Sequence, residues 1–133
     1  MIEVIYDLEG EKIALFCPGL QNKQDAIDFV SDSNDELQVG IMNRPKGYVI
    51  KPHAHNIVNR KLNYTTEVLI ILSGVLKTMF FDLKNEFIRE IILKEGDVLV
   101  LFKGAHGFEI VEEVRMLEIK QGPYQGINDK VFL

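Results

Sequence analysis

The sequence is short of several residue types, and each shortage excludes a class of protein. Its one cysteine, Cys17, has no partner for an internal disulfide, and its apolar neighbours favour a small buried side chain over a nucleophile. Basic residues are outnumbered by acidic ones, 15 against 20, and form no basic stripe. Because phosphate contacts supply most of the affinity for nucleic acids, we expect no nucleic-acid partner.

Long apolar stretches are missing as well. No run approaches the roughly 20 residues that span a membrane, and the first residues lack the basic segment and apolar stretch of a signal peptide. We therefore expect no membrane partner and a cytoplasmic location. Hydrophobic residues make up 47% and charged residues 26% of the 133, which excludes a largely disordered chain and predicts one folded domain over residues 1–133.

Short apolar runs separated by turn residues make up most of this domain. They predict an all-β barrel or sandwich that opens with a hairpin of residues 2–6 and 12–17 around Glu9-Gly10. Further strands are expected at residues 37–42, 48–55, 67–72, 75–81, 87–93, 98–102, 108–111 and 114–120. Residues 22–31 differ, because Ala26, Ile27 and Val30 recur at helical spacing after a capping Asn22; they predict one short helix.

The chain has only three histidines, and their positions predict a metal site. His53 and His55 are two residues apart, so both rings would project from one face of an extended segment. Glu67 begins an apolar run that resembles a buried strand, and His106 follows another such run. Imidazoles combined with one carboxylate suit a borderline divalent ion, and fewer than six protein ligands leave positions open for water or substrate.

These residues resemble the two sequence motifs of the cupin superfamily over roughly residues 40–121. The first motif is matched by Gly47, His53, His55, Glu67 and Gly74, and the second by Gly96, Gly104 and His106. The chain departs from the family pattern by the eleven residues between His55 and Glu67, by Phe102 in place of a proline, by a histidine one residue early, and by Ile110 in place of an asparagine. The resemblance implies a cupin-type jelly-roll β-barrel that holds one divalent transition metal ion, such as Fe, Mn, Ni or Zn.

Ordinary structural roles remain as alternatives for each of these residues. Any one of the three histidines could lie on the surface or be satisfied in the core. The Glu67 carboxylate could instead pair with Arg60 or Lys61 from the preceding loop. The metal hypothesis rests on all four side chains occurring in the order that the motifs require.

Four further residues are candidates for contact with a small-molecule substrate. Lys51 shares the strand face of His53 and could hold an anionic group, or it could be a rim lysine whose stem covers apolar surface. Arg60, in the loop of residues 56–66, could grip a carboxylate or phosphate, although that loop could also be a solvated extension or a dimer contact. Phe108 shares the face of His106 and would form an apolar wall, and Tyr124 lies in a predicted turn near the site.

The chain also looks similar to small bacterial and archaeal cupins found among genes for surface-polysaccharide and nucleotide-sugar synthesis. That resemblance is a hint about substrate class alone, a small, oxygen-rich, anionic molecule such as a sugar derivative. A metal ion with an open coordination site could polarise a carbonyl or hydroxyl of such a molecule, so we expect a metal-dependent isomerase or epimerase. Glu109, Glu118 or Tyr124 could act as its base. The alternatives are an iron-dependent oxygenase, a non-catalytic binding module, and a metal-free isomerase with a histidine base.

A homodimer is expected as well, because two predicted strands, residues 68–72 and 98–102, are apolar on both faces. One face would line the barrel, and the other would need cover. The N-terminal strands could supply that cover instead of a second subunit. The pattern of the last strand leaves open whether Arg115, Leu117 and Ile119 or Met116, Glu118 and Lys120 face the pocket.

Overall fold

The computed structural model describes residues 1–19 and 27–133, and the chain forms two units. The first comprises Met1–Leu20 and Tyr64–Leu133, and the second Gln21–Asn63. The first unit contains β1 (Glu3–Tyr6), β2 (Lys12–Cys17), β5 (Glu67–Phe81), β6 (Phe87–Lys94), β7 (Val98–Leu101), β8 (Ala105–Lys120) and the short 3-10 helix η1 (Gly126–Asp129). The second contains β3 (Ile27–Phe29) and β4 (Gly40–Met42). The prediction of an all-β chain is confirmed.

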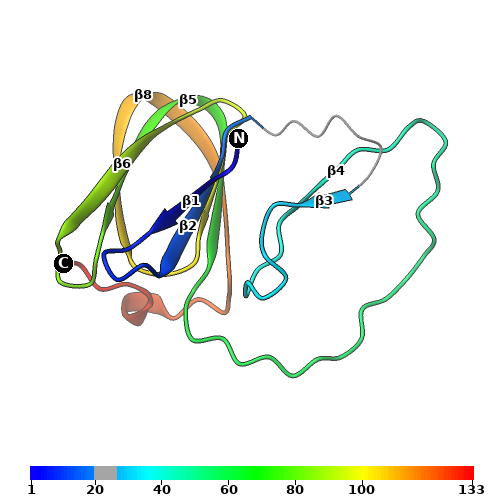
Figure 1. Cartoon of the computed structure of the whole chain (residues 1–133), viewed down its shortest axis with the longest axis horizontal. Coiled ribbons are helices and arrows are strands. Elements are labelled where there is room, and N and C mark those ends of the chain that lie inside the picture. Colours follow the sequence, from blue (N-terminus) through cyan, green and yellow to red (C-terminus); the bar gives the residue numbers. More distant parts are fainter. Residues whose placement is uncertain (20–26) are drawn as a thin grey trace. The chain divides into compact units, whose positions relative to one another are not determined.

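The first unit is one antiparallel sheet that curls into a half-barrel (Figure 1). Its strand order is β1-β2-β7-β5-β6, and β8 pairs with the other edge of β5. The long β5 strand organises the sheet. Its first residues pair with β7 and its last with β6, while β8 follows it from Glu67 to Phe81. Each end of β5 is therefore held between two strands.

A bulge at Ser73-Gly74 lets β5 run continuously where the sequence predicts two strands with a turn between them. The register against β8 shifts on both sides of Ser73. Gly74 has φ +86°, and a side chain there would collide with the carbonyl oxygen of Glu113 in β8. Only glycine adopts this conformation without strain, so the bulge needs Gly74 at this position.

The core lies on the concave face of the sheet. Aliphatic and aromatic side chains from five strands form it, among them Ile5, Ile13, Phe16, Leu69, Leu76, Phe80, Leu93 and Leu99. Every residue of β7 is at most 3% exposed, so this strand is covered within one chain. The N-terminal β2 pairs with β7 edge to edge within the same sheet, so this pairing does not cover a face of β7, and cover from the N-terminal strands stays a prediction. Cys17 is buried at the end of β2, as expected.

Direct pairing across β5 and β8 settles which face of the last strand turns inward. Paired residues share a face of the sheet, and Glu67 and Leu69 stand opposite Lys120 and Glu118. Glu118 and Lys120 therefore share the face of the core, and the alternate residues of that strand face outward. Beyond the bulges, His106 stands opposite Phe80 and again lies on the inner face.

Three further predictions of elements are wrong in the described chain. Residues 108–111 and 114–120, expected as two strands, both belong to the continuous strand β8. Ile27–Phe29, expected within a helix, is strand β3 and pairs with β4; residues 22–26 of that prediction lie outside the described residues. Ile27 and Phe29 are β-branched and aromatic, which fits a strand better than the spacing alone indicated. Residues 48–55 form no strand, since they have no strand partner among the described residues and Pro52 lacks a backbone N–H.

No helix among the described residues has the length and apolar character needed to cross a bilayer.

Candidate functional site

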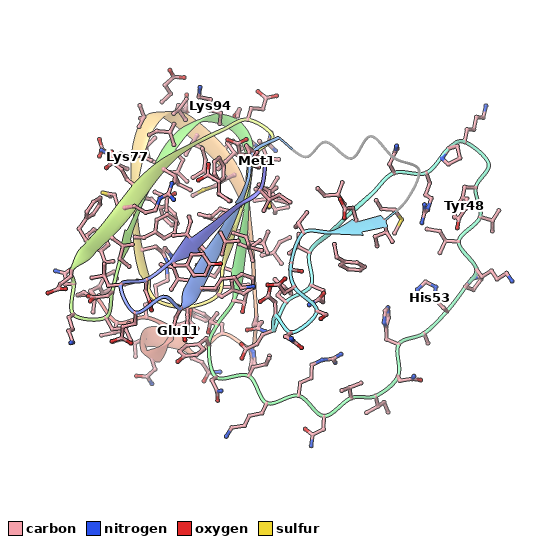
Figure 2. The ribbon with its side chains drawn as sticks, in the orientation of Figure 1. Met1, Glu11, Tyr48, His53, Lys77 and Lys94 are labelled. Atoms are coloured by element: carbon pink, nitrogen blue, oxygen red, sulfur yellow. The ribbon has the colours of Figure 1, made fainter. Side chains whose placement is uncertain are left out.

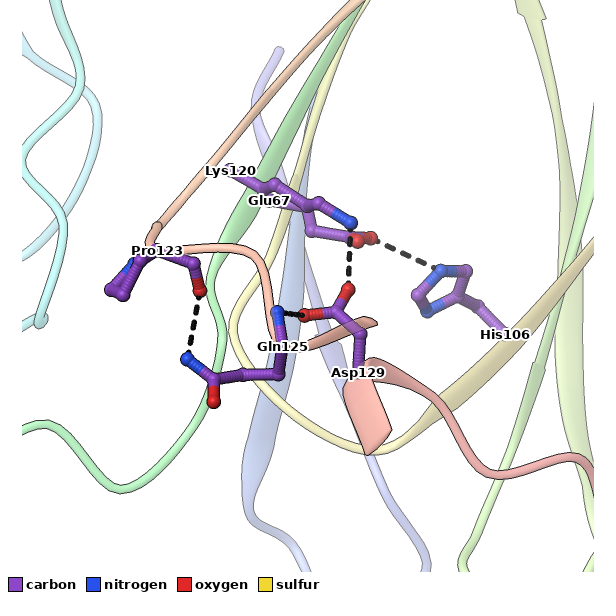
Figure 3. Close-up of polar contacts among 6 residues, drawn as sticks. All are labelled: Glu67, His106, Lys120, Pro123, Gln125 and Asp129. Atoms are coloured by element: carbon purple, nitrogen blue, oxygen red, sulfur yellow. Dashed lines mark hydrogen bonds and ion pairs between the residues drawn. The ribbon is translucent and has the colours of Figure 1, made fainter. Parts of the chain in front are cut away.

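The central feature of the site is a contact between Glu67 and His106. Glu67 begins β5 and His106 lies near the start of β8, and the His106 Nε2 atom is 3.2 Å from Glu67 Oε2 (Figure 3). The Glu67 side chain is 11% exposed and that of His106 27%. The hydrogen bond from His106 lowers the pKa of Glu67, and this effect outweighs burial, which acts in the opposite direction.

The same two atoms are spaced as neighbouring ligands of one metal ion would be. Metal bonds of about 2.0–2.2 Å at angles between 90° and 109° put adjacent donor atoms roughly 2.8–3.6 Å apart. The 3.2 Å between Oε2 and Nε2 falls in that range. A carboxylate and an imidazole are also donors that borderline divalent ions accept. An ion would replace the proton that Nε2 now shares with the carboxylate.

An ion pair lies beside this contact. Lys120, opposite Glu67 across the strand pair, places its Nζ 2.9 Å from Asp129 Oδ2 in η1 (Figure 3). The hydrogen bond between them raises the pKa of Lys120 and lowers that of Asp129. The backbone N–H of Gln125 donates to the other Asp129 oxygen at 3.4 Å, and the Gln125 side chain donates to Pro123 O at 3.0 Å. These bonds fasten the segment after β8 to the strand pair that carries Glu67.

The start of β5 is fixed by a reciprocal pair of bonds at the neighbouring residue. The Thr66 N–H donates to the Gln121 side-chain oxygen at 3.0 Å, and the Gln121 N–H donates to the Thr66 carbonyl at 3.3 Å. Thr66 is 1% exposed. The backbone that carries Glu67 is thereby held at the point where β5 and β8 meet.

His53 and His55 lie in the second unit, on an exposed segment (Figure 2). Their rings are neighbours, with centroids 5.6 Å apart and planes at 68°. The His53 Nδ1 atom is 2.8 Å from the Lys51 carbonyl oxygen, which can only accept, so Nδ1 carries the hydrogen. The lone pair of a neutral His53 is then on Nε2. A histidine that donates its other N–H to a carbonyl is the arrangement that metal-binding histidines commonly adopt.

The structure thus groups the four predicted ligands as two pairs, one in each unit. Glu67 contacts His106, and His53 is next to His55. Within residues 1–19 and 27–133, no group of three or more metal-ligating side chains is assembled. The four-ligand site therefore stays a prediction.

A pocket of about 600 Å³ opens beside Glu67 and His106. Apolar side chains make up much of its wall: Phe81, Leu83, Leu101, Phe108, Val131 and Phe132. Lys103 and Lys130 contribute positive charge to the wall, and Asn85 and Tyr64 contribute neutral polar groups. The Phe108 ring lies 5.2 Å from that of His106. Phe108 and His106 thus lie on one face of β8 and both line the pocket, while a contact of Phe108 with a substrate stays a prediction.

The other candidates for substrate contact lie elsewhere. Lys51 and Arg60 are exposed residues of the second unit. Tyr124 is 75% exposed and does not line the pocket, although its ring lies 5.7 Å from the Lys120 ammonium. Their roles toward a substrate stay predictions.

Two of the candidate bases are now distinguished by the face that they occupy. Glu109 stands opposite Lys77 on the outer face of the sheet and pairs with it. Glu118 stands opposite Leu69 on the inner face. Glu118 is therefore the carboxylate of the two that faces the same side as His106.

Sequence reasoning missed Asp129, Lys130 and Phe132 in the pocket wall and Gln121 beside Thr66. Residues 126–133 show no strand periodicity, and nothing in their spacing connects them to residue 67. The one available signal was the turn composition of residues 121–126, which predicts that the chain reverses after β8.

No protein-family model matches the chain, and neither curated proteins nor solved structures gave a match.

Proposed function

We propose that the protein is a metal-dependent enzyme of the cupin type that acts on a small, oxygen-rich, anionic molecule. The observation that carries the proposal is the contact of Glu67 with His106 at the wall of a pocket of about 600 Å³. The donor set fits a divalent transition metal, because the two atoms have the spacing of co-ligands and His53 keeps its Nε2 lone pair free. His53 and His55 would complete the ligand set.

The open edge of β8 supports the jelly-roll form that the resemblance implies. Within the described part of the chain, β8 pairs only with β5, so one edge of a 16-residue strand carries unpaired backbone groups. Such an edge favours pairing with a further segment. Metal binding through His53 and His55 would couple the ordering of residues 48–55 to occupancy of the site, since metal binding and folding are coupled when the ligands come from separate segments.

A bound divalent ion would polarise a carbonyl or hydroxyl oxygen of the substrate and stabilise negative charge that develops on it. Lys103 and Lys130 in the pocket wall would attract an anionic substrate, and Phe81 and Phe108 would exclude water from its other side. Glu118 lies on the inner face and is the carboxylate proposed as the base for an isomerisation or epimerisation.

Metal analysis of the natively purified protein tests the proposal directly. We expect about one transition metal ion per chain, and loss of most of it in each of the single variants His53→Ala, His55→Ala, Glu67→Gln and His106→Ala. The control is Glu109→Gln, which removes a carboxylate on the outer face and should keep the metal. Retention of full metal content by His53→Ala and His55→Ala would restrict the site to the first unit and overturn the four-ligand proposal.

A homodimer also stays a proposal. Since β7 is already buried within one chain, the remaining support is the exposed outer face of β8, where Leu117 and Ile119 are 47% and 52% exposed. Light scattering at micromolar concentration should give twice the chain mass of 15.2 kDa. A monomer mass under those conditions would exclude the dimer.

A further inference from the structure

The pocket wall combines positive charge with a large apolar area, and residues 129–133 form part of it. Val131 and Phe132 line the pocket, yet they are 81% and 91% exposed. Apolar side chains that edge a pocket and remain this exposed lose their contact with water when a ligand with an apolar group binds beside them. They are therefore placed to favour such a ligand.

The same wall carries charges of both signs, because Glu67 and Asp129 line it as well as the two lysines. Asp129 is already paired with Lys120, so the lysines of the wall are the groups placed to attract an anion. Lys103 is partly occupied, because its Nζ lies 2.8 Å from Glu11 Oε2 and 5.9 Å from the centre of the Tyr64 ring. No ion pair to Lys130 is found among the described residues, and its charge acts on the neighbouring Glu67 and Asp129. An anionic group in the pocket would bind next to Lys130.

One ion pair attaches the segment of residues 129–133 to the sheet. The Lys120–Asp129 ion pair joins η1 to β8, and Asp129 also accepts the N–H of Gln125. The Asp129 side chain is only 12% exposed. Because Lys120 stands opposite Glu67, the attachment point lies on the same strand pair as the candidate metal ligand.

From these observations we infer that the pocket selects an anion that also bears an aromatic or aliphatic group, and that residues 129–133, latched by the Lys120–Asp129 pair, form the wall that selects it. Phe132 and Phe81 contact the apolar group, and Lys130 contacts the anionic group. The inference deepens the proposed function and rests on it only in treating Glu67 and His106 as groups that face the ligand.

Fluorescence titration of the full chain with 8-anilinonaphthalene-1-sulfonate, an aromatic anion, tests the wall. We expect saturable binding that Phe132→Ser weakens at least fivefold and Lys130→Gln about threefold. Ile127→Ser is the matched control, because Ile127 is 94% exposed in the same segment but does not line the pocket. Equal effects of Phe132→Ser and Ile127→Ser, or no effect of either, would overturn the inference.

Competition against the bound dye tests separately whether the anionic group and the apolar group of a ligand contribute to binding. Phenyl phosphate should displace the dye at a concentration at least tenfold lower than inorganic phosphate or phenol. If phenol alone were as effective, the positive charge would have no part in selection. If inorganic phosphate alone were as effective, the apolar wall would have none, and either result contradicts the inference.

Amide hydrogen exchange tests the latch. In Asp129→Asn we expect exchange at Gln125 and within η1 to quicken at least fivefold and dye binding to weaken, whereas Lys120→Arg keeps the ion pair and both properties. Glu109→Gln breaks the comparable Lys77 pair on the outer face and should change neither. Unchanged exchange in Asp129→Asn would refute the latch. His53→Ala should abolish metal binding without changing dye binding, so the proposed function and this inference can fail separately.

Discussion

Two glycines of the same sequence motif, Gly47 and Gly74, show how the two units of the chain differ. Both adopt left-handed backbone conformations with nearly equal φ, +88° and +86°. A side chain at Gly47 would meet nothing within 4 Å, whereas one at Gly74 would collide with the backbone of Glu113. Gly47 is thus required only by its backbone conformation, whereas Gly74 is required both by its conformation and by the close approach of the Glu113 backbone.

The same contrast extends to the histidines. His106 lies in a paired strand against Glu67, while His53 and His55 lie on a segment whose residues are all exposed. The pairing of β5 with β8 fixes one half of the candidate metal site. The other half is set by local contacts such as the one from His53 to the Lys51 carbonyl.

Limited proteolysis should show the largest difference between the units. Trypsin is expected to cleave after Arg60 and Lys61, which are exposed and unpaired in any strand, about a thousandfold faster than after Lys77 within β5. Cleavage in β5 requires global unfolding, which costs roughly 5 kcal/mol or more in a stable domain. Mass spectrometry of timed digests gives both rates. Addition of a transition metal ion should slow the cleavage at Arg60 if the ion joins the two histidine-bearing segments.

Comparable rates at Arg60 and Lys77 would contradict the division into a packed and an exposed region. If cleavage at Arg60 stayed fast with metal bound, metal binding would not protect the loop of residues 56–66 from the protease. The bonds after Arg44 and Lys51 precede prolines and provide internal reference sites that should resist cleavage.

Substitution of the two motif glycines by alanine should give the next largest difference. Gly74→Ala is expected to destabilise the chain by about 3 kcal/mol or more, because the left-handed conformation and the collision with Glu113 both oppose the side chain. Gly47→Ala meets only the conformational cost, about 1 kcal/mol. Urea unfolding monitored by circular dichroism measures both. Equal losses would mean that Gly47 is also packed against other backbone.

These contrasts show how far the sequence determines the structure. Alternating and continuous apolar runs correctly predicted β1, β2, β6 and β7, because burial in a sheet selects the residues directly. The same reasoning divided β5 at Ser73-Gly74, since a Ser-Gly pair in the sequence does not distinguish a turn from a bulge. It placed a strand at residues 48–55, where the pattern is present but no partner strand is found in the described chain.

The candidate site was predictable to the same extent. Ordered motif residues led to Glu67 and His106, which the structure brings into contact from positions 39 residues apart. The pairs formed by Lys120 with Asp129 and by Thr66 with Gln121 follow from the register of β8 and from how the chain turns after it. Neither is encoded in a local pattern, so spacing alone could not have predicted them.

Neutralisation of Glu67 should produce a smaller, pH-dependent effect. The hydrogen bond from His106 lowers the folded-state pKa of Glu67, so its contribution to stability is complete above the ordinary glutamate pKa of about 4.3 and is lost as the pH falls through the lower folded value. Relative to the parent, Glu67→Gln should cost about 1.5–3 kcal/mol at pH 7, the range for a hydrogen bond to a charged group. The difference should shrink toward zero in acid.

Urea unfolding of the two proteins between pH 3 and pH 7 measures this difference. Glu90→Gln, on an exposed position of β6, controls for the loss of one negative charge. Parallel curves for the parent and Glu67→Gln would show that the His106 contact does not stabilise the fold.

The smallest expected effect is a gain in stability when the buried Thr78 is replaced by valine. Thr78 is fully buried on the inner face of β5, opposite Ile91 and Phe108, and its hydroxyl has no hydrogen-bond partner among the described residues. A buried hydroxyl without a partner opposes folding, and valine has nearly the same shape and suits a strand. Thr78→Val should therefore stabilise the chain by about 1 kcal/mol, measured by urea unfolding, while Thr65→Val at an exposed position should change little. A loss of stability in Thr78→Val would show that the hydroxyl has a hydrogen-bond partner in the folded chain.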